Sequence, residues 1–240
     1  MLILTGLLVL TSCHEPAGKA TESAYNLDPT RTIPPFPRIA IPADADTSSP
    51  RWKGIDLTPA PPVMPQSPRE QQESFVLQSG YSIEPVLTEP RIIEPAAIQF
   101  DGNGRMYVLE LRTYMQDIDA TDELQPISCI SRWEDLDDDG IYETGGIFLD
   151  SLVFPRFVVP FGPHTILAME SNQDVIYKYT DTDNDGKADK KEFFTDGMGR
   201  TGNVEHQTSF LTWTLDNWMY STYNPVRIRW TPDGILREPS

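Results

Sequence analysis

Two stretches of this chain repeat one another at a constant spacing, and this repeat limits the possible folds more than any other feature. Residues 130–140 align with residues 176–186 at an offset of 46 positions, and Phe148 then matches Phe194 at the same offset. A weaker third copy begins at Val226, with a tight turn in place of the acidic loop. A period of about 40–50 residues made of short strands is typical of a β-propeller blade, whereas helical repeats of that length need amphipathic helices.

Strand-like runs continue through the second part of the chain. β-Branched and aromatic residues are frequent in them, and turn residues separate them. The clearest runs lie at 106–111, 126–133, 165–169, 175–179, 218–222 and 226–230, with a partial alternation at 81–87. No stretch shows a convincing helical period. We therefore expect an all-β fold: a partial β-propeller of about three to four blades over residues 68–240, the N-terminal part of a longer propeller.

Two acidic loops occupy the same place in the two clear copies of the repeat. Both follow the pattern D-x-D-x-D-G-x-x-E/D; the candidate metal ligands are Asp135, Asp137, Asp139 and Glu143 in the first loop, and Asp181, Asp183, Asp185, Asp189 and Glu192 in the second. Alternate carboxylates around a glycine turn gather the hard oxygens that calcium prefers. The alternative is a pair of solvated acidic hairpin tips. We expect structural calcium at both loops, bound more tightly by the second, which offers more carboxylates.

The first residues have the character of an export signal. Residues 2–10 are almost wholly apolar and Cys13 follows them; the run is too short to span a bilayer, which needs about 20 residues. The segment Leu10-Thr11-Ser12-Cys13 resembles the lipobox of bacterial lipoproteins, which implies lipidation of Cys13. We expect residues 1–13 to be a lipoprotein signal peptide. The protein would then be anchored in the cell envelope, in the outer membrane or facing the periplasm.

A proline-rich stretch follows the predicted signal. Fourteen of the 22 prolines lie between residues 14 and 90, and residues 14–67 hold few periodic apolar positions. Such a composition favours an extended, partly polyproline II chain. We expect residues 14–67 to form a disordered linker that holds the propeller away from the membrane; the alternative is a loop that wraps around the domain.

Charge and cysteine content exclude several functions. With 19 Lys and Arg against 36 Asp and Glu, the net charge of −17 repels phosphate backbones, so we expect no nucleic-acid partner. Two cysteines cannot form a disulfide framework or a four-cysteine zinc site. Cys129 lies within a strand-like run, and we expect a buried, inert thiol there.

Several segments together resemble one known family. Residues 100–110, 202–207 and 215–221, together with the first acidic loop, resemble the membrane-bound dehydrogenase propellers, which are similar to the quinoprotein glucose/sorbosone dehydrogenases. The resemblance implies a dehydrogenase that uses pyrroloquinoline quinone to oxidise a sugar or alcohol and passes electrons to a cytochrome c. Members often carry a C-terminal cytochrome domain. No C-x-x-C-H motif occurs here, so haem c would belong to a missing C-terminal part.

The same resemblance singles out His206. In the quinoprotein sugar dehydrogenases a histidine opens the segment H-x-x-G-x-L-x-F-x-P-D-G-x-L-Y and acts as the general base. His206 opens a segment of the same frame here, in which Ser209, Leu215 and Asn217 replace a glycine, the proline and a second glycine. The resemblance places His206 at the start of an inner strand facing the central channel. The alternative is a hydrogen-bonded histidine at a blade edge.

Arg227 and Arg229 follow His206 in the chain, and either is a candidate to bind a quinone carboxylate. Two functions from different classes therefore stand side by side: a quinoprotein oxidoreductase, and a non-catalytic calcium-stabilised propeller that binds carbohydrate or protein. A glycosidase ranks below both, because no spacing singles out a pair of carboxylates.

Overall fold

The computed structural model describes residues 45–54, 64–117 and 119–240. The predicted signal peptide, Cys13 and most of the predicted linker lie outside these residues. The chain divides into two units, Met1–Glu84 and Pro85–Ser240. Among the described residues, no helix is both long and apolar enough to cross a membrane.

The described residues of the first unit include two short helical segments, the 3-10 helix η1 (Pro50–Trp52) and the α-helix α1 (Pro68–Ser74). A capping box starts α1: Glu70 N donates to Ser67 Oγ, and Ser67 N donates to the Glu70 carboxylate. Proline at the first helical position needs no hydrogen-bond partner there. The expectation of no helix was therefore wrong for this segment, because seven residues are too few to show a helical period.

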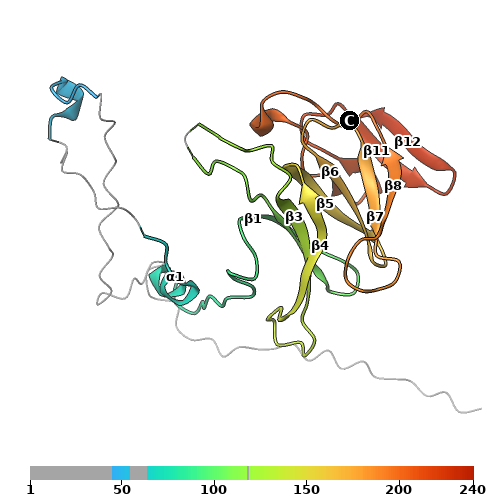
Figure 1. Ribbon diagram of the computed structural model, residues 1–240, viewed down its shortest axis with the longest axis horizontal. Helices are drawn as coiled ribbons and strands as arrows, with labels where there is room; N and C mark the ends of the chain where they lie inside the picture. Colours follow the sequence, from blue (N-terminus) through green and yellow to red (C-terminus); the bar gives the residue numbers. More distant parts are fainter. Residues whose placement is uncertain (1–44, 55–63, 118) are drawn as a thin grey trace, which may run out of the picture. The chain divides into compact units, whose positions relative to one another are not determined.

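The second unit consists of three four-stranded sheets, each an antiparallel meander in chain order (Figure 1). The first blade contains β1 (Pro95–Phe100), β2 (Met106–Glu110), β3 (Ser128–Glu134) and β4 (Thr144–Leu152). The second contains β5 (Pro155–Gly162), β6 (Thr165–Glu170), β7 (Ile176–Thr180) and β8 (Lys190–Thr195). The 3-10 helix η2 (Val204–His206) precedes the third, which contains β9 (Thr212–Trp213), β10 (Met219–Tyr220), β11 (Val226–Thr231) and β12 (Gly234–Pro239). The predicted all-β fold with propeller-like blades is confirmed.

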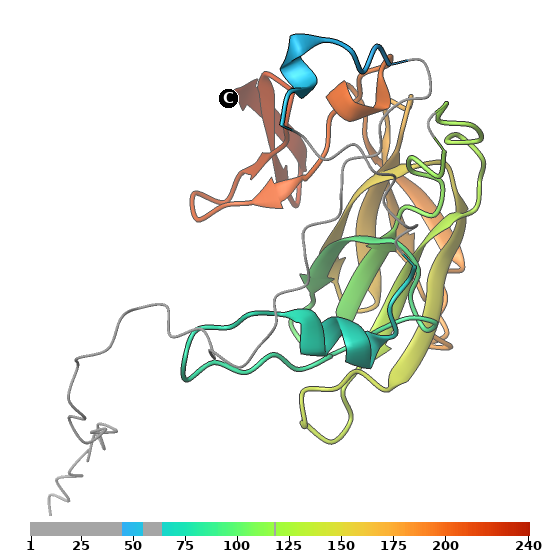
Figure 2. The same cartoon turned by 90° about the vertical axis from the view of Figure 1, so that its left-hand side faces the viewer.

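The meander places the loops of each blade alternately at two ends. The loops after the third strands, which in the first two blades are the acidic loops, lie at the same end as the turns after the first strands. The loops after the second strands and the connections between blades, including η2, lie at the other end. Figures 1 and 2 both show the β3–β4 loop and η2 at opposite ends of the unit. The predicted calcium loops and the predicted catalytic residue His206 therefore lie at different ends of the blades.

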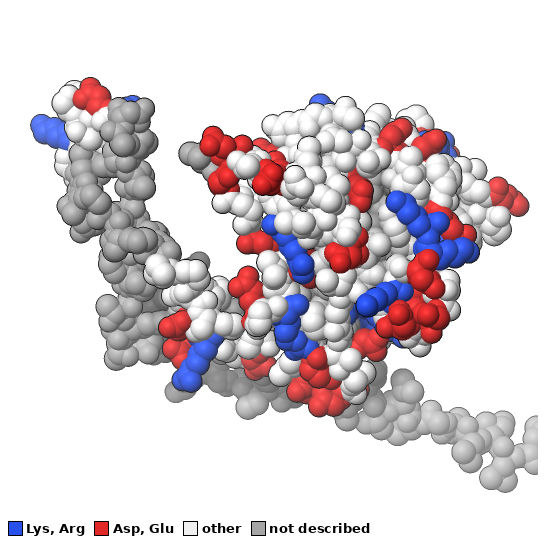
Figure 3. All heavy atoms as spheres, in the orientation of Figure 1, with Lys and Arg blue, Asp and Glu red and all other residues white. Residues whose placement is uncertain are grey.

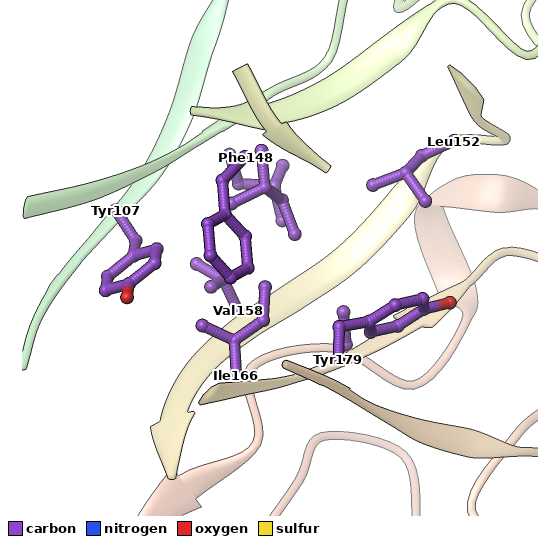
Figure 4. Packing of buried hydrophobic residues seen from close by; sticks show 9 residues of the cluster. Tyr107, Phe148, Leu152, Val158, Ile166 and Tyr179 are labelled. Atoms are coloured by element: carbon purple, nitrogen blue, oxygen red, sulfur yellow. The ribbon is translucent and has the colours of Figure 1, made fainter. Parts of the chain in front are cut away.

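Apolar residues on both faces of the middle blade hold the three sheets together. Along β6, Ile166 and Ala168 join the core shared with the first blade, while Leu167 and Met169 join the core shared with the third. Figure 4 shows Phe148 of the first blade packed near Ile166 in the former core. A strand buried on both faces reads as a continuous apolar run, which explains the clear signal at residues 165–169.

The outer face of the first blade is covered by an irregular segment rather than a strand. Leu87 and Ile92 pack with Trp133 in a third cluster, and the Arg91 guanidinium lies 4.8 Å from the centre of the Trp133 ring. The partial alternation at 81–87 does not form a strand, because Pro85 lacks a backbone donor at its centre.

The predicted buried thiol is also confirmed. Cys129 is free and buried within β3. Burial, with a smaller effect of the Glu110 carboxylate, raises the pKa of the Cys129 thiol to about 12. The thiol therefore stays protonated and unreactive at neutral pH.

Candidate functional site

The two acidic loops share one conformation. Gly140 and Gly186, which correspond in the repeat, both have a positive φ, 88° and 96°. The backbone N–H of each glycine donates to the first aspartate of its loop: Gly140 to Asp135 at 2.8 Å, and Gly186 to Asp181 at 3.0 Å. Only glycine adopts this backbone region without strain, so the loop geometry explains the glycine in each motif.

Each loop gathers its aspartates into a cluster. One carboxylate oxygen from each member lies within 4.8 Å of the others; the clusters are Asp135, Asp137, Asp139 and Glu143 in the first loop, and Asp181, Asp183 and Asp185 in the second. Figure 3 shows carboxylates gathered at the lower edge of the molecule, at the end where these loops lie. Both clusters could hold a metal ion, and oxygen-only ligands suit calcium.

Two carboxylates predicted for the second site do not join its cluster. Asp189 accepts hydrogen bonds from the hydroxyl and the backbone N–H of Thr182, and these bonds lower the pKa of the Asp189 carboxyl. Glu192 lies within β8, opposite Lys178, and forms ion pairs with Lys178 at 2.9 Å and Lys190 at 3.0 Å. Because β8 begins at Lys190, the chain is already an extended strand at Glu192. The second loop thus does not gather all five of its predicted ligands into one cluster.

Asp181 is the member of the clusters with the most unusual surroundings. Its side chain is 0% exposed, and its Oδ2 accepts from Gly186 N and from Arg132 Nη1 at 3.1 Å. Its Oδ1 is also buried, yet has no hydrogen-bond partner among the described residues. A buried carboxylate oxygen without a partner is costly. Since this oxygen belongs to a residue that clusters with Asp183 and Asp185, a bound cation would satisfy it.

A cavity of about 320 Å³ lies beside this loop. It is lined by the β3–β4 hairpin on one side and by the second acidic loop on the other; the residues include Arg132, Glu134, Gly146, Asp185 and Lys187. A Cβ atom at Gly146 would meet nothing within 4 Å, so the glycine leaves this space open. A cavity of this size has room for several waters, and calcium commonly keeps water among its ligands.

His206 lies at the opposite end, on η2. The side chain of Asn203 accepts from Glu205 N at 2.8 Å and caps this turn. The expectation of a strand position is wrong: η2 ends at His206, and β9 begins only at Thr212. His206 is exposed and its ring packs edge-on against Tyr223, with centroids 6.1 Å apart. Among the described residues, the imidazole has no hydrogen-bond partner.

Buried polar groups hold the chain next to His206 in place. Gln207 is buried; its amide nitrogen donates to Asn172 Oδ1 and to Gly202 O, each at 3.0 Å. Arg156 donates to the carbonyl oxygens of Gln207 and Thr208, and burial lowers the pKa of the Arg156 guanidinium. The sequence did not predict these hydrogen bonds, because Asn172 and Arg156 lie far away in the chain, in the β6–β7 loop and at the start of β5.

The two arginines that the sequence suggested for a quinone carboxylate, Arg227 and Arg229, contact other side chains of the third blade. Arg227 and Arg229 lie 4.5 and 4.6 Å from the centre of the Trp218 ring, and Arg227 also pairs with Glu238 at 2.7 Å. Arg200 instead lies 5.5 Å from the centre of the Tyr223 ring, the ring that His206 contacts. His206 and Arg200 therefore both contact the Tyr223 ring.

Comparison with known proteins places the chain in a family. No curated protein matches it. Among solved structures, the holo form of the pyranose dehydrogenase PQQ domain from Coprinopsis cinerea aligns at 15% sequence identity with a TM-score of 0.39, covering 62% of this chain and 30% of that structure. The chain therefore spans about 30% of that structure's length. The family described as "Domain of unknown function (DUF7133)" matches residues 67–236, well over half of the sequence, and the chain belongs to this family.

Proposed function

We propose that this chain supplies calcium-braced blades to a propeller of the cell envelope. The observation that carries the proposal is the buried Asp181 Oδ1, which lacks a partner and belongs to a cluster with Asp183 and Asp185. Calcium at this position would satisfy the buried oxygen and hold the loop between β7 and β8 closed. Its role there is structural, since the loop lies at the end of the blades opposite His206.

The first loop supports the same role through a larger ligand set. Its four clustered carboxylates are accompanied by a loop-closing bond, from Leu136 N to Glu143 Oε1 at 3.2 Å. Asp189 accepts the corresponding backbone bond from Thr182 in the second loop but does not join its cluster, which has three carboxylates. More ligand charge generally raises calcium affinity in such loops. Because the first cluster offers more carboxylates than the second, we propose that the first loop binds calcium more tightly, in place of the second loop that the sequence favoured.

A calorimetric calcium titration of the full chain tests this proposal. We expect two sites in the unmodified protein, loss of the tighter site in Asp137→Asn and loss of the weaker site in Asp183→Asn. Asp233→Asn is the matched control, because Asp233 lies in the turn of the third repeat copy, where no acidic loop occurs. No calcium heat in the unmodified protein would refute the proposal.

A second candidate function is oxidation of a sugar or alcohol. It rests on the match of the segment that His206 opens and on the contacts that His206 and Arg200 each make with the Tyr223 ring. Pyrroloquinoline quinone, when bound, would supply the hydride acceptor. His206 would take the substrate hydroxyl proton, since an imidazole is a common general base, and Arg200 would bind a carboxylate.

Substitution of His206 separates a catalytic from a structural role. The ring is exposed, so His206→Ala is expected to change the free energy of unfolding by less than about 0.5 kcal/mol. Turnover of the quinone-loaded, full-length protein should fall by about 10²–10⁴-fold. His164→Asn, at the other end of the second blade, should retain turnover. Normal turnover in His206→Ala would exclude His206 as the base.

The proposal also includes a membrane anchor and an electron acceptor. We propose a lipid anchor on Cys13, in the outer membrane or facing the periplasm, and a cytochrome c as electron acceptor, with haem c held in a further part of the protein. These elements rest on the Leu10–Cys13 segment and on the resemblance to the dehydrogenase propellers.

A further inference from the structure

We propose that Arg132 is a built-in counter-cation of the second acidic loop. It neutralises Asp181 when calcium is absent, keeps the first two blades joined, and lowers the affinity of the loop for calcium. This inference rests on the proposed calcium site at Asp181, Asp183 and Asp185, and it concerns how that site is regulated.

Arg132 reaches from one blade to the next. It belongs to β3 of the first blade, whereas Asp181 directly follows β7 of the second. Arg132 Nη1 lies 3.1 Å from Asp181 Oδ2, and the two side chains are 11% and 0% exposed. The guanidinium also lies 5.7 Å from the centre of the Phe148 ring, within the core that joins these blades. The ion pair is therefore part of the contact between the blades.

The pair occupies one carboxylate oxygen and leaves the other free. Arg132 and Gly186 N both use Asp181 Oδ2, while Oδ1 has no partner among the described residues. A Cβ atom on Gly186 would lie 3.4 Å from Arg132 Nη2, so the loop turns directly against the guanidinium. A cation on Oδ1 would share this carboxylate with Arg132. Two cations so close, in a partly buried setting, repel one another strongly.

The first loop lacks such a competitor among the described residues. The Asp135 carboxylate accepts hydrogen bonds from the backbone of its own loop, at Asp139 N and Gly140 N. Arg105, in the β1–β2 turn at the same end of the blade, pairs instead with Asp101 and Glu134. The two loops therefore share a conformation but differ in the cation that faces their first aspartate.

A calcium titration of Arg132→Met in an Asp137→Asn background tests the inference. Asp137→Asn removes the first site, so that the heat reports the second loop alone. Removal of the guanidinium should tighten calcium binding about tenfold and increase the calcium-dependent rise in melting temperature. Arg105→Met is the matched control: it removes a partly buried cation from the β1–β2 turn of the same blade, whose ion pairs are with Asp101 and Glu134, and it should change the affinity by less than about twofold.

The outcomes separate the inference from the proposed function. If the Asp137→Asn protein shows no calcium heat, the proposed site fails. If it binds calcium but Arg132→Met binds equally or more weakly, the site stands and the role of Arg132 is refuted. Arg132→Lys, which keeps the charge, should retain the affinity of the background. If Arg132→Met unfolds in chelator, refolding on addition of calcium supports the inference, whereas failure to refold in saturating calcium contradicts it.

Discussion

Asparagine in place of Asp181 should lower the free energy of unfolding of the calcium-free protein by about 3–5 kcal/mol. The change removes the closer and more deeply buried of the two carboxylates that pair with the Arg132 guanidinium, which is 11% exposed. The remaining acidic neighbour, Glu134, lies 3.6 Å away and is itself partly exposed. Breaking a buried ion pair by removing one partner costs far more than the pair contributes, because the other charge stays buried without compensation.

Asp183→Asn is the matched control for this prediction. Asp183 belongs to the same cluster but is exposed, so its replacement should cost less than about 0.5 kcal/mol in chelator. Urea unfolding of both variants without calcium measures the difference. Equal costs for the two variants would show that the Asp181–Arg132 pair does not hold the blades together.

Alanine in place of Phe148 should destabilise the protein by about 3–5 kcal/mol. The ring is 2% exposed in the core between the first two blades, and it packs edge-on against Tyr107 with centroids 5.4 Å apart. Removal of the ring leaves a cavity that two packed sheets cannot close, since their backbones are held by hydrogen-bonded ladders.

The control for Phe148 lies on the outer strand of the second blade. Phe193 is 63% exposed, so Phe193→Ala should change the free energy of unfolding by less than about 0.5 kcal/mol. Urea unfolding compares the two variants. A cost at Phe148 no larger than at Phe193 would contradict the assignment of this cluster as the core that joins the blades.

The parts of the fold that sequence predicted are those with a local signal. The repeat revealed the third and fourth strands of two blades, because the acidic loop between them marks each copy. β1 and β5 were not among the predicted strands. Both begin with proline, and Pro160 interrupts β5. Each pairs with one neighbour in its sheet, and such edge strands tolerate proline.

In the candidate site too, only the features with a local sequence signal were predicted. The carboxylates of the first loop are close in sequence, so their spacing was enough to predict a cluster. The exclusion of Glu192 depends on where β8 begins, and the burial of Asp181 depends on Arg132, 49 positions earlier in another blade. No local pattern reports such a contact. The position of His206 likewise depends on Asn203, whose side chain caps a turn where the resemblance implied a strand.

The most direct test of the account is an anomalous difference map from a crystal of the full chain grown with calcium. We predict a peak in each acidic loop, with the second about 2.3–2.6 Å from Asp181 Oδ1. Density for water alone in both loops, at a calcium concentration that saturates the calorimetric sites, would contradict the claim that calcium braces these blades.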